Sequence, residues 1–555
     1  MPNKRNPLYT VCMKIKTLFI LLISSILSVN SFASHPRDFI SDGALAVLSI
    51  QNGDSINTIA KAVSSQVGFS SKEPLLANYL SLFIQNPTGI DFSEEILLVV
   101  EPTKVQDGQS PTGMFGPIPH LVFVCKPKDG TNLKINKTYL KNSTLYDGWF
   151  IATAGDSSSE IETYRNSPIL KLLKKDQLSM AIKFGDIWKQ FGPIAQMTGG
   201  VMIGTLNKPG KDGLISQETK KFVSEISKAF GALMKFCGNI NVVTIGSGLQ
   251  DFKLVTNVDI ELITKEDVFI NNRSMLQMSS LLADNMIQYA MSSDLTRKLL
   301  EYDLTSIQTA TNVELPVTPI TQGLKLISDL SGHNVVSYNL SKQNGLSIAA
   351  LTEVENQSDY LDAIPTFMDE LTEYLLSEMN MSIVPSQTNK HTWDVSMIGS
   401  DSEDQKIMDA VFPKGDTLRF KKFGKDKISI ALGPKNWKSV SQKRATPLAL
   451  VIKENKDIAI DFAMTIDARD LLCGFVDVSK SAGQADDISN IRTTPSAKLS
   501  FVFGRDNDGY SAQNKLDLMG IAMVQRDIEA ARQEAKANAN SRISSGGIVG
   551  TKSKN

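Results

Sequence analysis

The chain has 555 residues, of which 42% are hydrophobic and 21% are charged, and its formal net charge is −1. This composition is typical of a globular protein with enough apolar residues for a sizeable core, so it excludes disorder as the main state. A nearly neutral chain also lacks the basic excess that draws proteins to nucleic acid, and we expect no nucleic-acid partner.

The N-terminal region has the pattern of an export signal. A lysine-bearing start at 13–16 precedes the apolar run 17–29, and small residues follow it up to Ala33. This order is typical of a cleaved secretory signal peptide, with Met13 as the true start. The apolar run is too short for a retained anchor, and no later run approaches the roughly 18 apolar residues of a membrane span. We therefore expect residues 1–33 to be removed and the protein to be exported, periplasmic or extracellular, without a transmembrane anchor.

Three cysteines would remain after cleavage, namely Cys125, Cys237 and Cys473. An odd number allows at most one internal disulfide, so the chain is not a disulfide scaffold. Export permits such a bridge but does not require one. Each cysteine ends an apolar stretch, which predicts small buried side chains.

Short apolar strands alternate with amphipathic helices in the first part of the chain. Strands are predicted at 44–50, 96–100, 120–125, 149–154 and 178–184. Helices are predicted at 56–67, 74–85, 159–174, 185–197 and 216–236, the last being the longest because its apolar residues share one face. A hairpin follows, with strands at 241–246 and 252–260 and a turn near Gly248.

The second part of the chain repeats this order of elements. The corresponding segments are 334–340 with 44–50, 346–351 with 121–125, 427–433 with 149–155, 457–463 with 177–183, and the hairpin at 498–509 with the one at 241–260. Identity between them is low, so the inference depends on the order of elements. We predict an α+β fold of two similar halves, each a mainly antiparallel sheet with helices on one face, joined by a helical connector.

The predicted boundaries follow from this repeat. They are a signal peptide at 1–33, a first α+β half at 34–264, a helical connector at 265–313 (helical from 274 to 309), a second α+β half at 314–520, a C-terminal helix at 521–540 and a disordered tail at 541–555. The halves differ at one place. The first half has the long helix 216–236 and glycine-rich segments at 199–200 and 207–213, where the second has only a polar stretch, 479–494.

Several short phrases carry a family resemblance. They are Thr-Gly-Ile-Asp-Phe at 88–92 before a strand, Pro-His-Leu-Val-Phe-Val at 119–124 with Lys-Asp-Gly at 128–130, and Gly-Trp-Phe-Ile-Ala at 148–152. With them, the segment 40–190, and more faintly 314–520, resembles exported bacterial proteins of the planctomycete-like, domain-of-unknown-function type. The resemblance implies export and an α+β fold, and it transfers no catalytic residues.

Residues that carry chemistry are sparse. His120, His333 and His391 are too far apart in the chain to form a local ligand pair, and a Ser/His/Asp triad would have to be assembled from distant segments. The triplet 246–248 lacks the spacing of a nucleophile elbow and is predicted to be a hairpin turn. The segment 207–213 lacks the spacing of a phosphate-binding loop. We therefore predict no catalytic residue, no metal ligand and no cofactor.

Acidic residues are assigned structural roles. The segment 506–509 lacks the ligand pattern of a calcium loop and is predicted to be a turn. Asp186 and Asp467 are predicted to be helix N-caps, and the acidic segment 401–404 is predicted to begin a helix. The four tryptophans are predicted to lie in the core or at interfaces, and they are Trp149, Trp188, Trp393 and Trp437.

Three functions stay open at this point. The first is an exported, soluble protein with a non-catalytic binding or structural role. The second is a carrier of an apolar ligand or lipid, held between a curved sheet and long helices such as 216–236, with methionines as an adaptable lining. The third is a hydrolase with a dispersed active site. The expected partner classes are an apolar ligand and an envelope protein.

Overall fold

The computed structural model describes residues 35–66, 68, 74–102, 120–154, 167–206, 217–282, 286–295, 331–377, 382–398, 402–413, 415–434, 440, 446–483 and 496–545. The predicted signal peptide, the segments 207–213 and 484–494, Trp437 and the last ten residues of the predicted tail lie outside these ranges.

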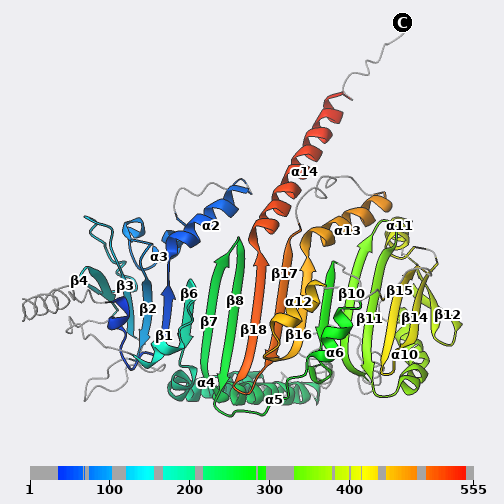
Figure 1. Ribbon diagram of the computed structural model, residues 1–555, viewed down its shortest axis with the longest axis horizontal. Coiled ribbons are helices and arrows are strands. Elements are labelled where there is room, and N and C mark those ends of the chain that lie inside the picture. The colour runs from blue at the N-terminus through cyan, green and yellow to red at the C-terminus, as the bar shows by residue number, and fades with distance from the viewer. Residues whose placement is uncertain are drawn as a thin grey trace, which may run out of the picture.

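One antiparallel sheet of 18 strands organises this part of the chain (Figure 1). The strands of the first part are β1 (Ala46–Ile50), β2 (Ile96–Glu101), β3 (His120–Cys125), β4 (Asn142–Tyr146), β5 (Trp149–Thr153), β6 (Leu178–Ile182), β7 (Ile240–Gln250) and β8 (Lys253–Leu262). Those of the second part are β9 (Ile287–Met291), β10 (Ser331–Ser341), β11 (Gly345–Val354), β12 (Ser382–Asn389), β13 (Thr392–Ile398), β14 (Asp416–Phe423), β15 (Lys427–Pro434), β16 (Ala459–Asp467), β17 (Lys498–Arg505) and β18 (Gly509–Asp517).

The pairings place the strands in a single series from one edge to the other. The order is β4-β5-β3-β2-β1-β6-β7-β8-β18-β17-β16-β9-β10-β11-β15-β14-β13-β12. Among the described strands the sheet is therefore open, with β4 and β12 at its edges. The side chains of β4 are mostly exposed, and Leu145 is 64% exposed there.

Helices connect many of these strands. They are α2 (Gly53–Gln66), α3 (Leu75–Leu80), α4 (Phe184–Leu206), α5 (Gln217–Asn239), α6 (Arg273–Ser279), α10 (Gln357–Ser377), α11 (Ser402–Val411), α12 (Pro447–Glu454), α13 (Ala468–Ser481) and α14 (Leu518–Ser545), with short 3-10 helices η1 (Pro36–Phe39), η2 (Pro87–Gly89) and η3 (Pro168–Leu172). Within the described ranges, no helix is long and apolar enough to cross a bilayer.

Strand β3 is buried on both faces, which explains why its sequence is apolar throughout and does not alternate with polar residues. Phe123 and Cys125 belong to a core that includes Leu76 of α3, whereas Val122 and Val124 belong to a second core that includes η1. Successive side chains of a strand point to opposite faces, so a strand covered on both faces needs an unbroken apolar run. The sequence Leu-Val-Phe-Val-Cys meets this requirement.

The second part of the sheet is covered mainly on one face. Met275 of α6 and Leu448 of α12 pack with Ala290, Val335 and Ala463 of the strands beneath them. The alternate residues of these strands point to the opposite face and are half-buried. Aromatic rings lie side by side there, in the pairs Tyr289–Tyr338 (ring centroids 5.9 Å apart), Tyr289–Phe462 (6.2 Å) and Phe462–Phe501 (6.2 Å).

The first and second parts of the sheet meet at strands β8 and β18. Lys253 pairs with Asp517 at one end and Glu261 with Gly509 at the other. At the centre, the Nε2 of Gln513 donates a hydrogen bond of 2.9 Å to the Oδ1 of Asn257. The two parts therefore share one hydrogen-bonded ladder.

The predicted α+β class with mainly antiparallel strands is confirmed, but the strands form one continuous sheet, not one sheet in each half. The helical connector is wrong in part. Among its described residues, α6 and residues 293–295 are helical, whereas Ile287–Met291, predicted to be helical, is strand β9 between β16 and β10. This five-residue segment contains one polar residue, Gln288, which is buried like its apolar neighbour Ala290. So short a run has no period that separates strand from helix.

Other boundaries also differ from the predictions. The triplet 246–248 lies inside β7, and the turn falls at Asp251 and Phe252, whose φ angles of 49° and 63° are those of a type I′ hairpin turn. A side chain at Gly246 would meet the carboxylate of Asp176, which explains a glycine within a strand. Of the helix predicted at 159–174, the described residues contain only η3, and α14 runs through 541–545 of the predicted tail.

The three cysteines differ in how deeply their side chains are buried. Cys125 is fully buried, and burial raises the pKa of its thiol, so it is a small protonated core residue as predicted. Cys237 and Cys473 are only half-buried, so the prediction that they are buried is wrong. No disulfide joins any two of these three residues.

The β8–β18 junction generates a test. The φ of Gly509 is +154°, and a Cβ there would lie 2.0 Å from the carbonyl oxygen of Ile260 in the neighbouring strand. We expect Gly509→Ala to lower the free energy of unfolding by about 2–3 kcal/mol, because backbone atoms must move apart. Chemical denaturation measures this.

The matched control is Gly43→Ala, whose Cβ would meet only Pro102 at an ordinary 3.7 Å. This variant is expected to stay within about 0.5 kcal/mol of the parent protein. Equal stability of the two variants would show that the β8–β18 contact does not constrain the fold.

Candidate functional site

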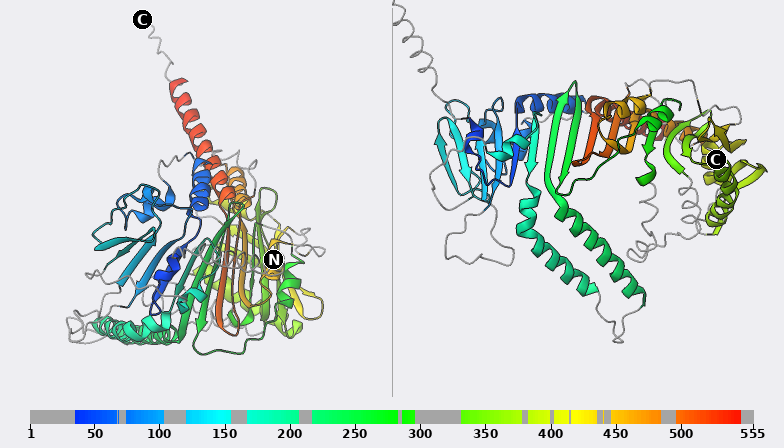
Figure 2. Two further views of the ribbon diagram at one scale, coloured as in Figure 1. Left: turned by 60° about the vertical axis from the view of Figure 1, so that its left-hand side comes forward. Right: turned by 60° about the horizontal axis from the view of Figure 1, so that its bottom comes forward.

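The most distinctive part of the molecule is the pair of long helices α4 and α5, here called the helical hairpin. It leaves the sheet after β6, returns directly into β7, and extends away from the strands (Figure 2). The sequence predicted α5 closely, but α4 continues nine residues beyond the predicted end at 197, to Leu206. The predicted helix stopped early because Gly199 and Gly200 are poor helix formers.

Small residues let the two helices approach closely. Gly185, Gly192 and Gly199 recur every seven residues in α4, and Gly231 and Gly238 have the same spacing in α5. A seven-residue spacing keeps residues on one face of a helix, and on these faces a Cβ at Gly199 or Gly238 would meet a side chain of the other helix. This signal was present in the sequence and was not used to predict the pairing.

Two aromatic side chains fill the space left by these glycines. A Cβ on Gly192 would lie 2.9 Å from the ring of Trp188, and one on Gly238 would lie 3.3 Å from the Nε1 of the same ring. A Cβ on Gly199 would lie 2.0 Å from the Cζ of Phe230. These three glycines are therefore explained by packing. Trp188 itself is half-buried, so it is neither a full core residue nor a surface one.

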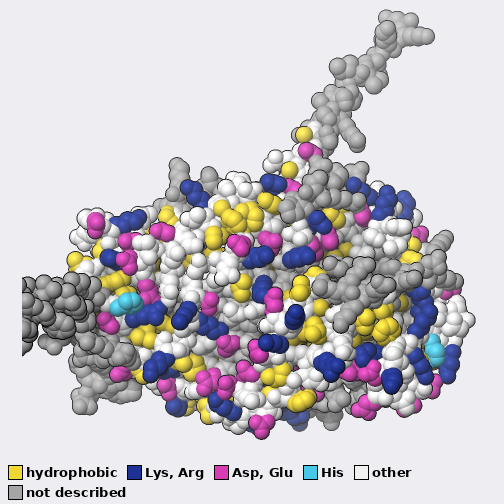
Figure 3. Space-filling view, viewed as in Figure 1, with side chains coloured by type: hydrophobic (Ala, Val, Ile, Leu, Met, Phe, Trp, Pro, Cys, Tyr) yellow, Lys and Arg dark blue, Asp and Glu magenta, His cyan; other side chains and the backbone are white. Residues whose placement is uncertain are grey.

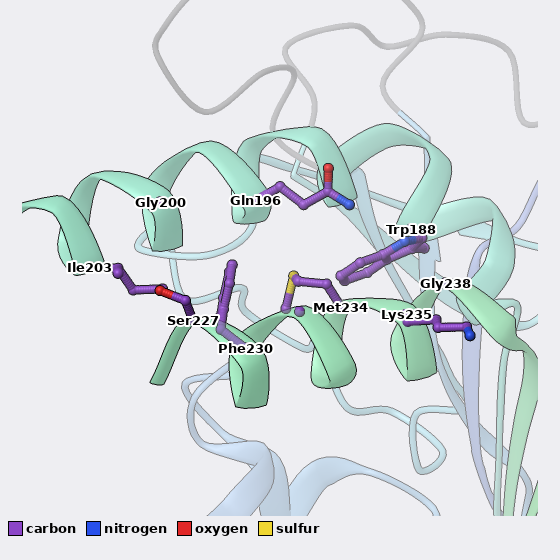
Figure 4. Close-up of a pocket in the computed structure, with 10 residues that line it drawn as sticks. Trp188, Gln196, Gly200, Ile203, Ser227, Phe230, Met234, Lys235 and Gly238 are labelled. Carbon is purple, nitrogen blue, oxygen red and sulfur yellow. The ribbon is translucent and has the colours of Figure 1, made fainter. Parts of the chain in front are cut away.

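A groove of about 780 Å³ runs between the two helices (Figure 4). Its lining residues are Trp188, Gln196, Gly200, Ile203, Ser227, Phe230, Gly231, Met234, Lys235 and Gly238. Phe230 and Met234 point from α5 toward α4, and Trp188 closes one end. The four large apolar side chains of the lining are all half-buried, so each presents apolar surface to the groove.

Two further glycines keep the groove open. Gly200 and Gly231 face each other's helices across it, and a Cβ on either would meet no atom within 4 Å. Each glycine inside an exposed helix costs about 1 kcal/mol relative to alanine. No protein contact accounts for this cost at these two positions, in contrast to Gly192 and Gly199.

The polar groups of the lining define its chemistry. They are the amide of Gln196, the hydroxyl of Ser227 and the ammonium of Lys235, and no carboxylate, imidazole or thiol is among the lining residues. The groove thus combines an apolar floor with one cation and uncharged hydrogen-bonding groups. Such a lining can hold an apolar chain that ends in a polar or anionic group.

The three histidines beyond His35 lie on different elements. His120 of β3 places its Nδ1 3.6 Å from the Oε2 of Glu101, His333 is in β10, and His391 is in the turn between β12 and β13. Across the described ranges, no group of three or more His, Cys, Asp and Glu side chains is arranged to hold a metal ion.

The acidic residues have local structural roles. Asp467 is the predicted N-cap of α13, accepting a hydrogen bond of 3.2 Å from the Asp470 N–H, and the Oδ1 of Asp506 accepts from two N–H groups of the β17–β18 turn. Asp186 is not the N-cap of α4, which begins earlier at Phe184, and instead pairs with Lys189 at 2.9 Å. Helix α11 begins at Ser402, within the acidic segment that was predicted to start a helix.

No protein-family model matches the chain, and no curated protein matches it at a significant level. Among solved structures, crystal form III of TP0453 is similar with a TM-score of 0.20 and 6% identity, over 45% of this chain and 97% of that one. A TM-score this low carries no information about a shared fold.

The glycine positions of α4 generate a prediction about the hairpin. Gly204→Ala adds a Cβ in open space and should stabilise the helix by about 1 kcal/mol. Gly199→Ala gains the same helix propensity but displaces the ring of Phe230, so we expect it to be less stable than Gly204→Ala. Hydrogen exchange of the α5 amides measures the difference, and equal protection in both variants would contradict the packing described for Phe230.

Proposed function

We propose that this protein is a non-catalytic binding protein that holds an elongated apolar ligand of the acyl-chain class in the groove of the helical hairpin. The observation that carries the proposal is the pair Gly200 and Gly231, which keep an apolar groove open without any packing role. The groove volume lies within the range of about 300–1,000 Å³ that is usual for small-molecule sites.

The dimensions of the groove fit this ligand class. Trp188 and Ile203, at its ends, are fifteen residues apart on α4, which corresponds to about 22 Å at 1.5 Å per residue. One acyl chain spans about half of the 30 Å hydrocarbon core of a bilayer, or about 15 Å. A single chain therefore fits along the groove with room for a head group beside Lys235.

We also propose that the chain consists of two similar halves. Its support is the strand order. The series β4-β5-β3-β2-β1-β6-β7-β8 corresponds to β14-β15-β11-β10-β9-β16-β17-β18 when both are counted toward the β8–β18 junction and the two outermost strands of the second part, β12 and β13, are left out. The pairing of β8 with β18 is also symmetric about Asn257 and Gln513. An experimental structure in which one rotation superposes the two series would test this.

The halves differ where the ligand groove lies. The connection from β6 to β7 contains the whole helical hairpin, whereas the matching connection from β16 to β17 begins with the shorter α13. A binding function assigned to the hairpin is therefore specific to the first half, and the second half is assigned a supporting role.

The ligand proposal predicts a specific effect of filling the groove. Gly200→Trp places an indole between Phe230 and Gln196, and we expect it to abolish retention of acyl-chain ligand. Native mass spectrometry of the purified full chain, incubated with a palmitate or lysophosphatidylglycerol probe, measures the bound mass.

The matched control is Gly204→Trp. Gly204 is on the same helix and has the same open surroundings, but it does not line the groove. This variant is expected to bind the probe as the parent protein does. A parent protein that binds neither probe would refute the proposal and favour a structural role, while turnover of the probe would favour the hydrolase alternative.

We also propose that the mature protein is exported to the periplasm or beyond, on the strength of the N-terminal sequence 13–33. Expressed from its own start in a Gram-negative host, the chain should appear outside the cytoplasm with Ser34 as its first residue. N-terminal sequencing of the fractionated protein tests this, and an uncleaved cytoplasmic chain would refute it.

A further inference from the structure

The far end of α4 exposes a set of large apolar side chains. The set is Met197 (58% exposed), Val201 (62%), Met202 (65%) and Leu206 (46%), here called the α4 apolar patch. No residue of α4 beyond Lys189 is ionisable. A helix segment without charged residues and with large apolar side chains on several sides is normally buried, but these four side chains are exposed.

The adjoining helix continues this apolar surface. Leu233 of α5 is 53% exposed and Phe236 is 39% exposed. Phe236 lies at the sheet end of the hairpin, where its ring is 5.9 Å from that of Tyr510. Exposed apolar side chains therefore occur along the hairpin from its tip to the sheet.

The charge of the hairpin is opposite to that of the rest of the chain. Its two helices contain five basic residues (Lys189, Lys220, Lys221, Lys228 and Lys235) and three acidic ones (Asp186, Glu218 and Glu225), a net charge of +2. Because the whole chain has −1, the remainder has −3. The face of the molecule seen in Figure 3 has basic and acidic side chains interspersed, without a large area of one sign.

The lysines of α5 lie on a different side from its apolar residues. Lys228 and Lys235 are seven residues apart and so share one side of the helix, about half a turn from Leu233. An amphipathic helix with lysines on one side and large apolar residues on the other lies in the interface of a lipid bilayer, and anionic lipids strengthen its binding.

We propose that the helical hairpin docks on the surface of an anionic lipid bilayer, with the α4 apolar patch inserted among the lipids and the α5 lysines at the head groups. Charge complementarity selects this occupant, because a positive hairpin on an otherwise negative chain directs that end of the molecule toward anionic lipid. The proposal does not require that the groove hold a ligand.

The test is co-sedimentation of the full chain with vesicles of equal parts phosphatidylcholine and phosphatidylglycerol, compared with phosphatidylcholine alone. The parent protein should bind the anionic vesicles and be released by added salt, which screens the lysines. Met202→Asp puts a charge into the α4 apolar patch and should weaken binding at least about tenfold.

The matched control is Thr144→Asp, which adds the same charge at an exposed position of the edge strand β4, outside the hairpin. It should retain most of the binding, since it leaves the apolar patch intact. Circular dichroism of both variants checks that the helices remain folded. Equal loss in both variants, or no binding of the parent protein to anionic vesicles, would overturn the proposal.

Two further outcomes are informative. If Met202→Asp instead dissolves a dimer seen by light scattering, the patch is an interface between two copies and the bilayer proposal is wrong. Gly200→Trp should lose the acyl-chain probe but keep vesicle binding, so failure of the ligand proposal and failure of the docking proposal are distinguishable.

Discussion

The backbone hydrogen bonds between β8 and β18 are the interaction on which the architecture depends. They join strands that are separated by more than two hundred residues in the chain, and without them the sheet would divide into two. Strand pairs so distant in sequence form slowly, because loop closure is costly before the contact is made. This junction adds to ordinary strand pairing the hydrogen bonds of Gln513 to Asn257 and of Ser511 to Asp259, and the absence of a side chain at Gly509.

Much of the secondary structure could be predicted from apolar periodicity, and the failures have physical causes. β11, β15 and β16 were expected because each alternates or is uniformly apolar between turn residues. β9 was mistaken for a helix because five apolar and polar residues buried from several sides have no distinguishing period. The continuity of the sheet could not be predicted, since it depends on pairing along the whole length of β8 and β18, the second strands of two distant hairpins.

The groove was not predicted from the sequence for a different reason. Glycines in a helix were interpreted as a sign that the helix ends, whereas in α4 they permit close approach to α5 at Gly199 and keep space open at Gly200. Propensity describes an isolated helix, and tertiary contacts with Trp188 and Phe230 override it. A seven-residue spacing of glycines on two consecutive segments distinguishes glycines that allow helix packing from glycines that end a helix. Glycines that only end a helix have no reason to recur at this spacing.

The two edge strands of the sheet differ in how readily they could pair with another chain. β12 contains Pro385, which has no N–H to offer to another strand, while the last strand on the other side, β4, has no proline and exposes Leu145 and Tyr146. Proline therefore hinders another chain from pairing with the β12 edge, whereas nothing comparable hinders pairing with the β4 edge. Under crowding or partial unfolding, aggregation of this protein should begin beside Asn142–Tyr146.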